Sequence, residues 1–215
     1  MEELLTFEEI RIIGSLIEKE LTTPEYYPLT VNALKNACNQ KSNREPVVSF
    51  DEKTIEAMLD KLRDKALVRR VTGSDIRVPK YRQNFTEEMK FSSEEIAVMC
   101  VLMLRGPQTP GEIKSRSGRM FNFESLAQLD GVLQSLTNRE KPLIIKLPRQ
   151  TGMKESRYAH LLSGMPDFES LNNNTPAAVP VDAGKIAELE EQVDILRGEL
   201  QELKQQFSRF KQQFE

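Results

Sequence analysis

The chain has 215 residues, of which 39% are hydrophobic and 29% are charged, a composition typical of a soluble globular protein with one large or two small cores. Its formal net charge of −3 gives no overall argument for a nucleic-acid partner. No apolar run approaches the roughly 20 residues of a membrane-spanning helix, and the acidic start "MEELLTFEEI" is unlike a secretory signal. We therefore expect a cytoplasmic protein that does not enter a membrane.

The first predicted helix begins at a capping box, in which the Thr6 hydroxyl and the Glu9 carboxylate satisfy each other's backbone N–H groups. A short second helix carries Leu34. A third helix is expected to open with a second cap formed by Ser49 and Glu52. Its apolar residues are spaced i, i+3, i+4 and i+7, as on one buried helix face. These residues are Ile55, Met58, Leu59 and Leu62. Two extended segments around Gly73 follow and predict a β-hairpin.

The same pattern then recurs. The segment "LTFEEIRIIGSLI" matches "FSSEEIAVMCVLM" without a gap, and Ser92 with Glu95 repeats the capping box. The third-helix spacing returns in Leu129, Val132, Leu133 and Leu136, and Gly152 takes the place of Gly73. Three helices followed by a hairpin is the order of a winged helix, a helix-turn-helix with an added wing. We predict an α+β, mostly helical protein with two tandem winged-helix domains, residues 1–86 and 87–162.

The remaining chain predicts a linker and a coiled coil. Residues 163–184 are rich in Asn, Pro and Ala and lack periodicity, whereas apolar residues recur at alternating steps of three and four over residues 185–215. The seam that we expect to pair two chains includes Leu189, Val193, Leu196, Leu200, Leu203 and Phe207. Lys185 would face Glu190, and Glu199 would face Lys204, with opposite sign in a parallel arrangement. The prediction is a parallel homodimer.

Residues 36–47, "NACNQKSNREPV", interrupt the helical pattern between the second and third helices. Asn39 is suited to end a helix in the left-handed conformation, Asn43 to hold a turn, and Pro46 to force the preceding residue out of the helical region. This reading gives a rigid structural loop. It leaves Lys41 and Arg44 unexplained, and these cations are also suited to contact a phosphate backbone. The two readings are compatible, and both stay open.

Four long motifs, "LTTPEYYPL", "ACNQKSNREPV", "LMLRGPQTPGE" and "KESRYAHL", resemble the YceH-like family of bacterial proteins. The resemblance covers residues 4–162. It implies a tandem winged-helix fold in a cytoplasmic setting and implies no enzyme activity, cofactor or ligand. The first hairpin departs from the family pattern, because Asp75 stands where the family usually has a second glycine.

The sequence offers no support for catalysis. Two cysteines and one histidine, Cys38, Cys100 and His160, cannot supply a four-ligand zinc site, and no phosphate-binding loop or carboxylate cluster is recognisable. Cys38 would need a histidine partner to act as a nucleophile, and His160 lies in the other repeat. Because Cys100 aligns with Gly14, we expect both thiols to be buried packing residues. The expectation is a protein that is not an enzyme and has no cofactor or metal.

Two functions stay open. The first is DNA binding as a dimer, because the hairpins are rich in Lys and Arg. The candidate phosphate contacts are Lys41, Arg44, Arg69, Arg77, Lys80, Lys154 and Arg157. The second is a protein-interaction scaffold without direct DNA binding, because the outer face of the first repeat's third helix is mixed and rather acidic from Glu52 to Asp64.

Overall fold

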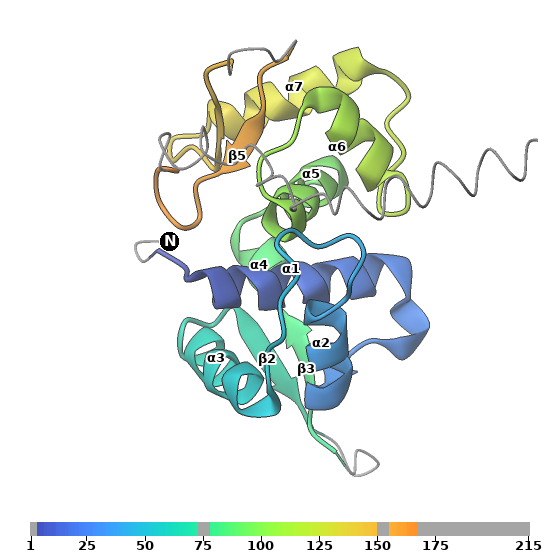
Figure 1. The fold of residues 1–215 in the computed structure, drawn as a ribbon, viewed down its shortest axis with the longest axis vertical. Coiled ribbons are helices and arrows are strands. Elements are labelled where there is room, and N and C mark those ends of the chain that lie inside the picture. The colour runs from blue at the N-terminus through green and yellow to red at the C-terminus, as the bar shows by residue number, and fades with distance from the viewer. Residues whose placement is uncertain (1–3, 73–77, 150–154, 167–215) are drawn as a thin grey trace, which may run out of the picture. The chain divides into compact units, whose positions relative to one another are not determined.

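The computed structural model describes residues 4–72, 78–149 and 155–166. In this part of the chain the protein is α+β, with seven α-helices, a three-stranded sheet and a two-stranded sheet (Figure 1). The expected coiled coil, residues 185–215, lies outside the described residues, as does all of the expected linker except residues 163–166. Among the described helices, none combines the length and the apolar character that crossing a bilayer requires.

The first repeat contains helices α1 (Phe7–Thr22), α2 (Val31–Cys38) and α3 (Glu52–Asp64), with a short 3-10 turn, Pro24–Tyr26, after α1. The capping box of Thr6 and Glu9 is present at the start of α1. Strands β1 (Leu29–Thr30), β2 (Val68–Val71) and β3 (Lys80–Gln83) form an antiparallel sheet in the order β1-β3-β2. The apolar face of α3 is buried as its spacing predicts, with Ile55, Leu59 and Leu62 fully enclosed.

The start of α3 corrects one expectation. Its N-cap is Asp51, whose Oδ1 accepts a 2.8 Å hydrogen bond from the backbone N–H of Thr54, rather than Ser49 with Glu52. Asp51 immediately precedes the first helical residue, where a side-chain oxygen reaches the unsatisfied N–H groups of the first turn. Ser49 lies two residues earlier.

A short helix, α4 (Phe85–Glu88), leads into the second repeat, which contains α5 (Ser93–Arg105), α6 (Pro110–Ser117) and α7 (Leu126–Thr137). Capping boxes open both α5 and α6. Strands β4 (Ile144–Lys146) and β5 (Tyr158–His160) form an antiparallel pair, and a single bridge from Gln108 to Tyr158 extends it. The second repeat therefore has the same order of three helices and a hairpin as the first.

The two repeats meet where α1 packs against α5. The Cys100 Sγ lies 3.4 Å from the carbonyl oxygen of Gly14, and a Cβ added at Gly14 would lie 3.0 Å from the Leu104 side chain. Glycine thus permits the close approach of the two helices, as the alignment of Cys100 with Gly14 suggests. One apolar core runs through both repeats. Helices α3 and α7 lie on opposite sides of the α1–α5 layer (Figure 1).

Candidate functional site

The loop between α2 and α3 is closed by its own side chains. The amide of Asn39 donates to the carbonyl oxygen of Phe50 at 2.8 Å and accepts from the Phe50 N–H at 2.9 Å, which ties the two ends of the loop together. Asn39 has a φ of −90°, so the expected left-handed helix end is not at this residue. The left-handed residue is Asn43, with a φ of 60°. Asparagine tolerates this conformation better than most residues.

Arg44 lies inside the protein, and the structure corrects the expectation that it faces a phosphate. Its guanidinium donates to both carboxylate oxygens of Glu18, at 3.0 and 2.6 Å, and to the backbone oxygens of Ala37 and Asn43. The side chain has no exposed surface. Burial alone would raise the pKa of Glu18, but the hydrogen bonds and the charge of Arg44 hold it below the ordinary value. Arg44 therefore binds the C-terminal end of α2 and is not available to contact a phosphate.

A second buried arginine supports the same loop. Arg11 donates to the carbonyl oxygens of Pro46 at 2.7 Å and Cys38 at 3.5 Å, and its guanidinium lies 5.3 Å from the centre of the Phe7 ring. Burial lowers the pKa of Arg11, and the charge of Arg44 lowers it further. Sequence reasoning missed Arg11 and Glu18. The available clue was their separation of seven residues, which puts both on one face of the helix.

The loop docks on the second repeat. The N–H of Glu45 donates to the carbonyl oxygen of Leu104 at 2.9 Å, and the Asn43 Oδ1 accepts from Arg105. Lys41, which lies between Asn39 and Asn43 in this loop, is exposed. Figure 1 shows this loop beside α5, whereas the first hairpin extends from the other side of the first repeat. The structure therefore does not bring Lys41 together with the hairpin cations into one surface.

The first hairpin does gather positive charge. In the β2–β3 pair Arg69 lies directly opposite Arg82, and Lys80 lies two residues from Arg82 on the same sheet face. Arg69 and Arg82 are well exposed, and Glu87 is the acid near both, at 4.0 and 3.5 Å. Like charges placed directly opposite destabilise a sheet. We call Arg69, Lys80 and Arg82 the basic sheet face. Arg77, the fourth candidate of this hairpin, lies outside the described residues.

The described cations of the second hairpin are less available for contact with a phosphate than those of the first. The guanidinium of Arg157 donates to the carbonyl oxygen of Pro107 at 3.0 Å and lies 3.9 Å from the carboxylate of Glu112, so it holds the loop after α5. Lys154 lies outside the described residues. Lys146 is exposed, with its ammonium 6.0 Å from the centre of the Tyr158 ring. Arg157 is a poor candidate for a free phosphate contact.

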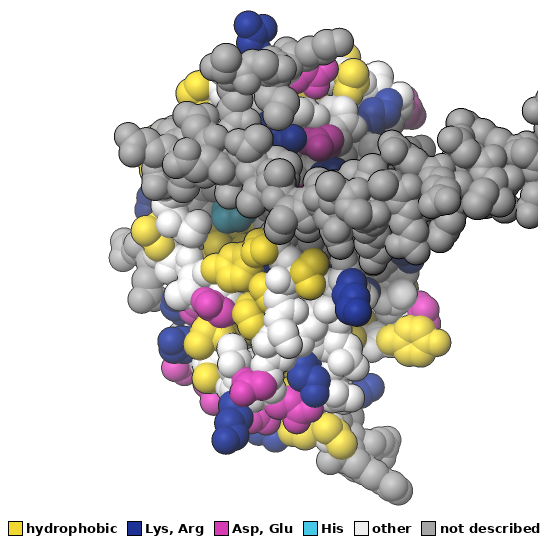
Figure 2. Space-filling view, viewed as in Figure 1, with side chains coloured by type: hydrophobic (Ala, Val, Ile, Leu, Met, Phe, Trp, Pro, Cys, Tyr) yellow, Lys and Arg dark blue, Asp and Glu magenta, His cyan; other side chains and the backbone are white. Residues whose placement is uncertain are grey.

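The third helices carry no net positive charge. On the outer side of the first repeat Lys35 pairs with Glu52 at 2.6 Å, and Arg63 pairs with Asp60 at 2.9 Å. Acidic and basic side chains alternate over this region in Figure 2. Helix α7 exposes Asp130 as its one charged side chain. Neither helix has the positive charge that would favour its insertion between the phosphate backbones of a DNA groove.

The two cysteines are buried and unpaired. Burial raises the pKa of Cys38 to about 11 and raises that of Cys100 as well, so both remain thiols at neutral pH. Within the described part of the chain no group of three or more His, Cys, Asp or Glu side chains is arranged to hold a metal ion. These thiols pack in the core, where Cys38 is the last residue of α2.

Comparison with known proteins finds close and full-length likeness. A family model described as "Protein of unknown function, DUF480" matches residues 5–153. A UPF0502 protein of Solibacter usitatus is 50% identical over 210 residues, which cover 96% of each chain. A UPF0502 protein of Aeromonas hydrophila is 49% identical over 94% of this chain and 95% of its own. One from Geobacter sulfurreducens is 47% identical over the full length of both. These descriptions state no activity that could be carried over.

Proposed function

The chain belongs to the family described as protein of unknown function, DUF480, and we propose that this member is a non-enzymatic DNA-binding protein whose phosphate contacts come from its first hairpin. The expectation of a bacterial family without an assigned biochemical role is confirmed. Because both repeats have the helix and hairpin order of a winged helix, we take them as two tandem winged-helix domains, residues 1–86 and 87–162. The analogy of fold alone does not carry the function.

The observation that carries the proposal is the pairing of Arg69 with Arg82 beside Lys80. Cations on sheet edges often serve only to prevent strands from pairing between molecules. That task does not require two arginines directly opposite each other, a repulsive arrangement that the single carboxylate of Glu87, 4.0 Å from Arg69 and 3.5 Å from Arg82, offsets only in part. A polyanion lying along this face would relieve the repulsion, and phosphate oxygens match the guanidinium fork. The basic sheet face is thus better suited to a nucleic-acid backbone than α3 or α7.

Contact through a wing rather than a recognition helix has a consequence for specificity. Backbone contacts position a protein on a duplex but carry no sequence information. With the mixed face of α3 away from the bases, binding should depend weakly on sequence. The proposal is therefore an architectural or loosely specific DNA-binding protein. High sequence specificity is typical of proteins that insert a recognition helix into the major groove, which this proposal does not require.

A protein-interaction scaffold is the second candidate, and the surface of α7 favours it. The exposed side of this helix combines Leu126, half of whose surface is exposed, with the small residues Ala127 and Gly131. An exposed leucine beside uncharged residues suits the core of a protein interface, where charged residues are depleted, better than contact with phosphates. The opposite placement of α3 and α7 also suits a scaffold, because adjacent grooves of one straight duplex could not receive both helices.

The dimer is a proposal from the heptad pattern of residues 185–215. A parallel pair of chains would present two basic sheet faces, and the second would bind at a raised effective concentration once the first is bound. Removal of residues 185–215 should convert a dimer to a monomer in light scattering. An unchanged number of subunits would exclude dimerisation through this segment.

The function is tested by fluorescence anisotropy with a labelled duplex of about 20 base pairs at low salt. The triple variant Arg69→Gln/Lys80→Gln/Arg82→Gln should bind at least about tenfold more weakly than the parent. A matched control, Lys53→Gln/Lys61→Gln/Lys141→Gln, removes the same charge from exposed positions elsewhere and should bind like the parent. Equal loss in both variants would show only a general charge effect. Failure of the parent to bind at low salt would leave the scaffold as the better account.

A further inference from the structure

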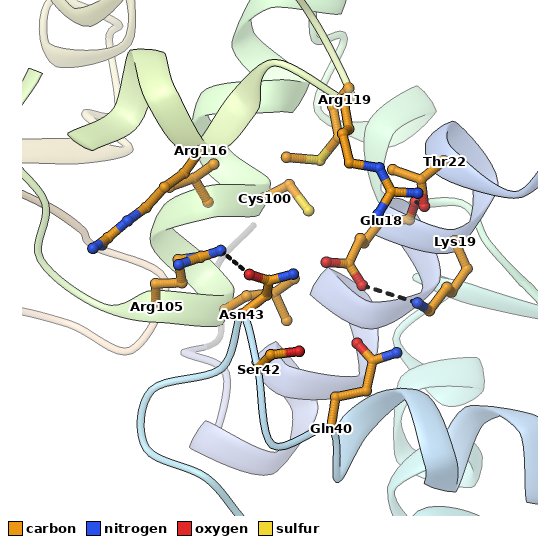
Figure 3. A pocket seen from close by; sticks show the side chains of 13 residues that line it. Glu18, Lys19, Thr22, Gln40, Ser42, Asn43, Cys100, Arg105, Arg116 and Arg119 are labelled. Atoms are coloured by element: carbon orange, nitrogen blue, oxygen red, sulfur yellow. Dashed lines mark hydrogen bonds and ion pairs between the residues drawn. The ribbon is translucent and has the colours of Figure 1, made fainter. Parts of the chain in front are cut away.

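A pocket of about 200 Å³ lies between the two repeats, away from the basic sheet face. Its walls come from α1, the loop after α2, α5, and the segment from α6 to Met120 (Figure 3). The apolar floor includes Val101, Leu104 and Met120. Residues of two motifs, "ACNQKSNREPV" and "LMLRGPQTPGE", meet here, and the DNA-binding proposal uses neither motif.

The pocket carries a strong excess of positive charge. Lys19, Arg105, Arg116 and Arg119 line it together with one carboxylate, that of Glu18. That carboxylate is bound on both oxygens by the buried Arg44 and lies 3.4 Å from the ammonium of Lys19, so one negative charge is shared among these cations and offsets only part of the surrounding charge (Figure 3). Burial lowers the pKa of Arg105, and the charge of Arg116 is the next cause. The protein therefore holds these cations close together, which makes the charged form of Arg105 less favourable than in water.

Several of the lining groups are not engaged by the protein. In the part of the chain that the structure describes, no hydrogen bond or ion pair involves the side chains of Gln40, Ser42 or Arg119. Figure 3 shows Arg119 reaching toward Glu18 and Thr22. Arg105 turns toward Asn43 and donates one hydrogen bond to its side-chain oxygen. The other N–H groups of the Arg105 guanidinium are left for a ligand. Arg116 extends to the side, where it pairs with Glu112 at 3.4 Å.

We propose that this pocket binds a small, multiply charged phosphate-bearing anion, held between the two repeats by Lys19, Arg105 and Arg119. The volume is below the roughly 300–1,000 Å³ of pockets for drug-sized molecules, which limits the ligand to a phosphate, a pyrophosphate or a compact phosphorylated metabolite. Arginine forks match phosphate oxygens, and Gln40 and Ser42 add neutral donors at the rim. Because Lys19 comes from α1 and Arg105 from α5, the bound anion joins the repeats across their interface.

The test is isothermal titration of the full chain with inorganic phosphate and with pyrophosphate, at constant ionic strength set by chloride. We expect pyrophosphate to bind in the micromolar to millimolar range and more tightly than phosphate, because it presents more charge. Arg119→Gln should weaken binding about tenfold, and Arg119→Lys should restore part of it, because lysine keeps the charge but lacks the planar fork. The exposed Arg119 makes no described bond, so both variants should melt with the parent. Lys61→Gln, which removes the same charge from α3, should bind pyrophosphate like the parent.

Three outcomes overturn this proposal. The first is the absence of any binding by either anion at about 10 mM. The second is equal binding by the parent and Arg119→Gln. The third concerns nucleic acid as the source of the phosphate group. If neither free anion binds while Arg119→Gln weakens duplex binding, the pocket belongs to a DNA interface instead. The DNA-binding proposal is independent, because it rests on the basic sheet face and is tested with other variants.

Discussion

Replacing Arg44 by alanine should destabilise the protein strongly, although this arginine belongs to a polar loop. The side chain is buried, and its removal leaves the Glu18 carboxylate without its bidentate partner. It also leaves the carbonyl oxygen of Ala37 without the two N–H groups that satisfy it at the end of α2. A buried acceptor that loses its donor keeps the full penalty of having left water.

The expected magnitude follows from these contacts. Breaking a buried ion pair by removing one partner costs about 3–5 kcal/mol. Glu18 retains 13% of its side-chain surface and can recover some hydration, so the lower end, about 3 kcal/mol, applies. For a chain of this size, about 1 kcal/mol corresponds to roughly 2–4 °C in melting temperature. Arg44→Ala should therefore melt roughly 6–12 °C below the parent.

Thermal and urea unfolding of both proteins would measure this loss. Lys41→Ala is the matched control, since it removes an exposed cation three residues away and should change stability by less than about 0.5 kcal/mol. A double-mutant cycle with Glu18→Ala should show a coupling free energy of about 1 kcal/mol or more between the two side chains. If Arg44→Ala melts with the parent, the buried network does not hold the loop, and the reasoning is refuted.

Three further predictions concern stability and reactivity. Burial lowers the pKa of His160, the single histidine, to about 4, so its contribution to stability is complete above pH 6.5 and is lost as the pH falls from there toward 4. Urea unfolding should show a loss of about 2 kcal/mol between pH 7 and 5 that His160→Gln abolishes, and an equal loss in that variant would exclude His160 as its cause. Because burial raises the pKa of both Cys38 and Cys100, a thiol reagent should label neither in the folded protein at pH 8 and both in urea; rapid native labelling would contradict this. Gly14→Val should destabilise by about 1–3 kcal/mol, since its Cβ would press on Leu104, and melting at the parent temperature would show that the α1–α5 contact is not tight.

Local patterns were enough to predict most of the helices. The box of Thr6 and Glu9 and the spacing from Ile55 to Leu62 depend on residues three or four apart, which the sequence displays directly. The cap of α3 was misplaced because Ser49 and Asp51 are both suitable cap residues. The residue that caps α3 is decided by where the helix begins, and the two hydrogen bonds between Asn39 and the backbone of Phe50 place that start just after Phe50.

The candidate site was harder to predict because its partners are distant in sequence. Arg44 meets Glu18 across 26 positions, and Asn43 meets Arg105 across 62. A loop arginine looks the same in sequence whether it faces solvent or a carboxylate on another helix. The pocket draws its walls from separate segments in both repeats, so no spacing could reveal it. The basic character of the first hairpin, in contrast, was visible, since its cations are close in sequence.

The most direct test of DNA binding by the basic sheet face is the salt dependence of duplex binding. The slope of log K against log salt concentration falls by about 0.9 for each lost phosphate contact. The account predicts that Arg69→Gln/Lys80→Gln/Arg82→Gln lowers the magnitude of the slope by about three, while Lys41→Gln leaves it unchanged. A slope that stays at the parent value in the triple variant would contradict the account.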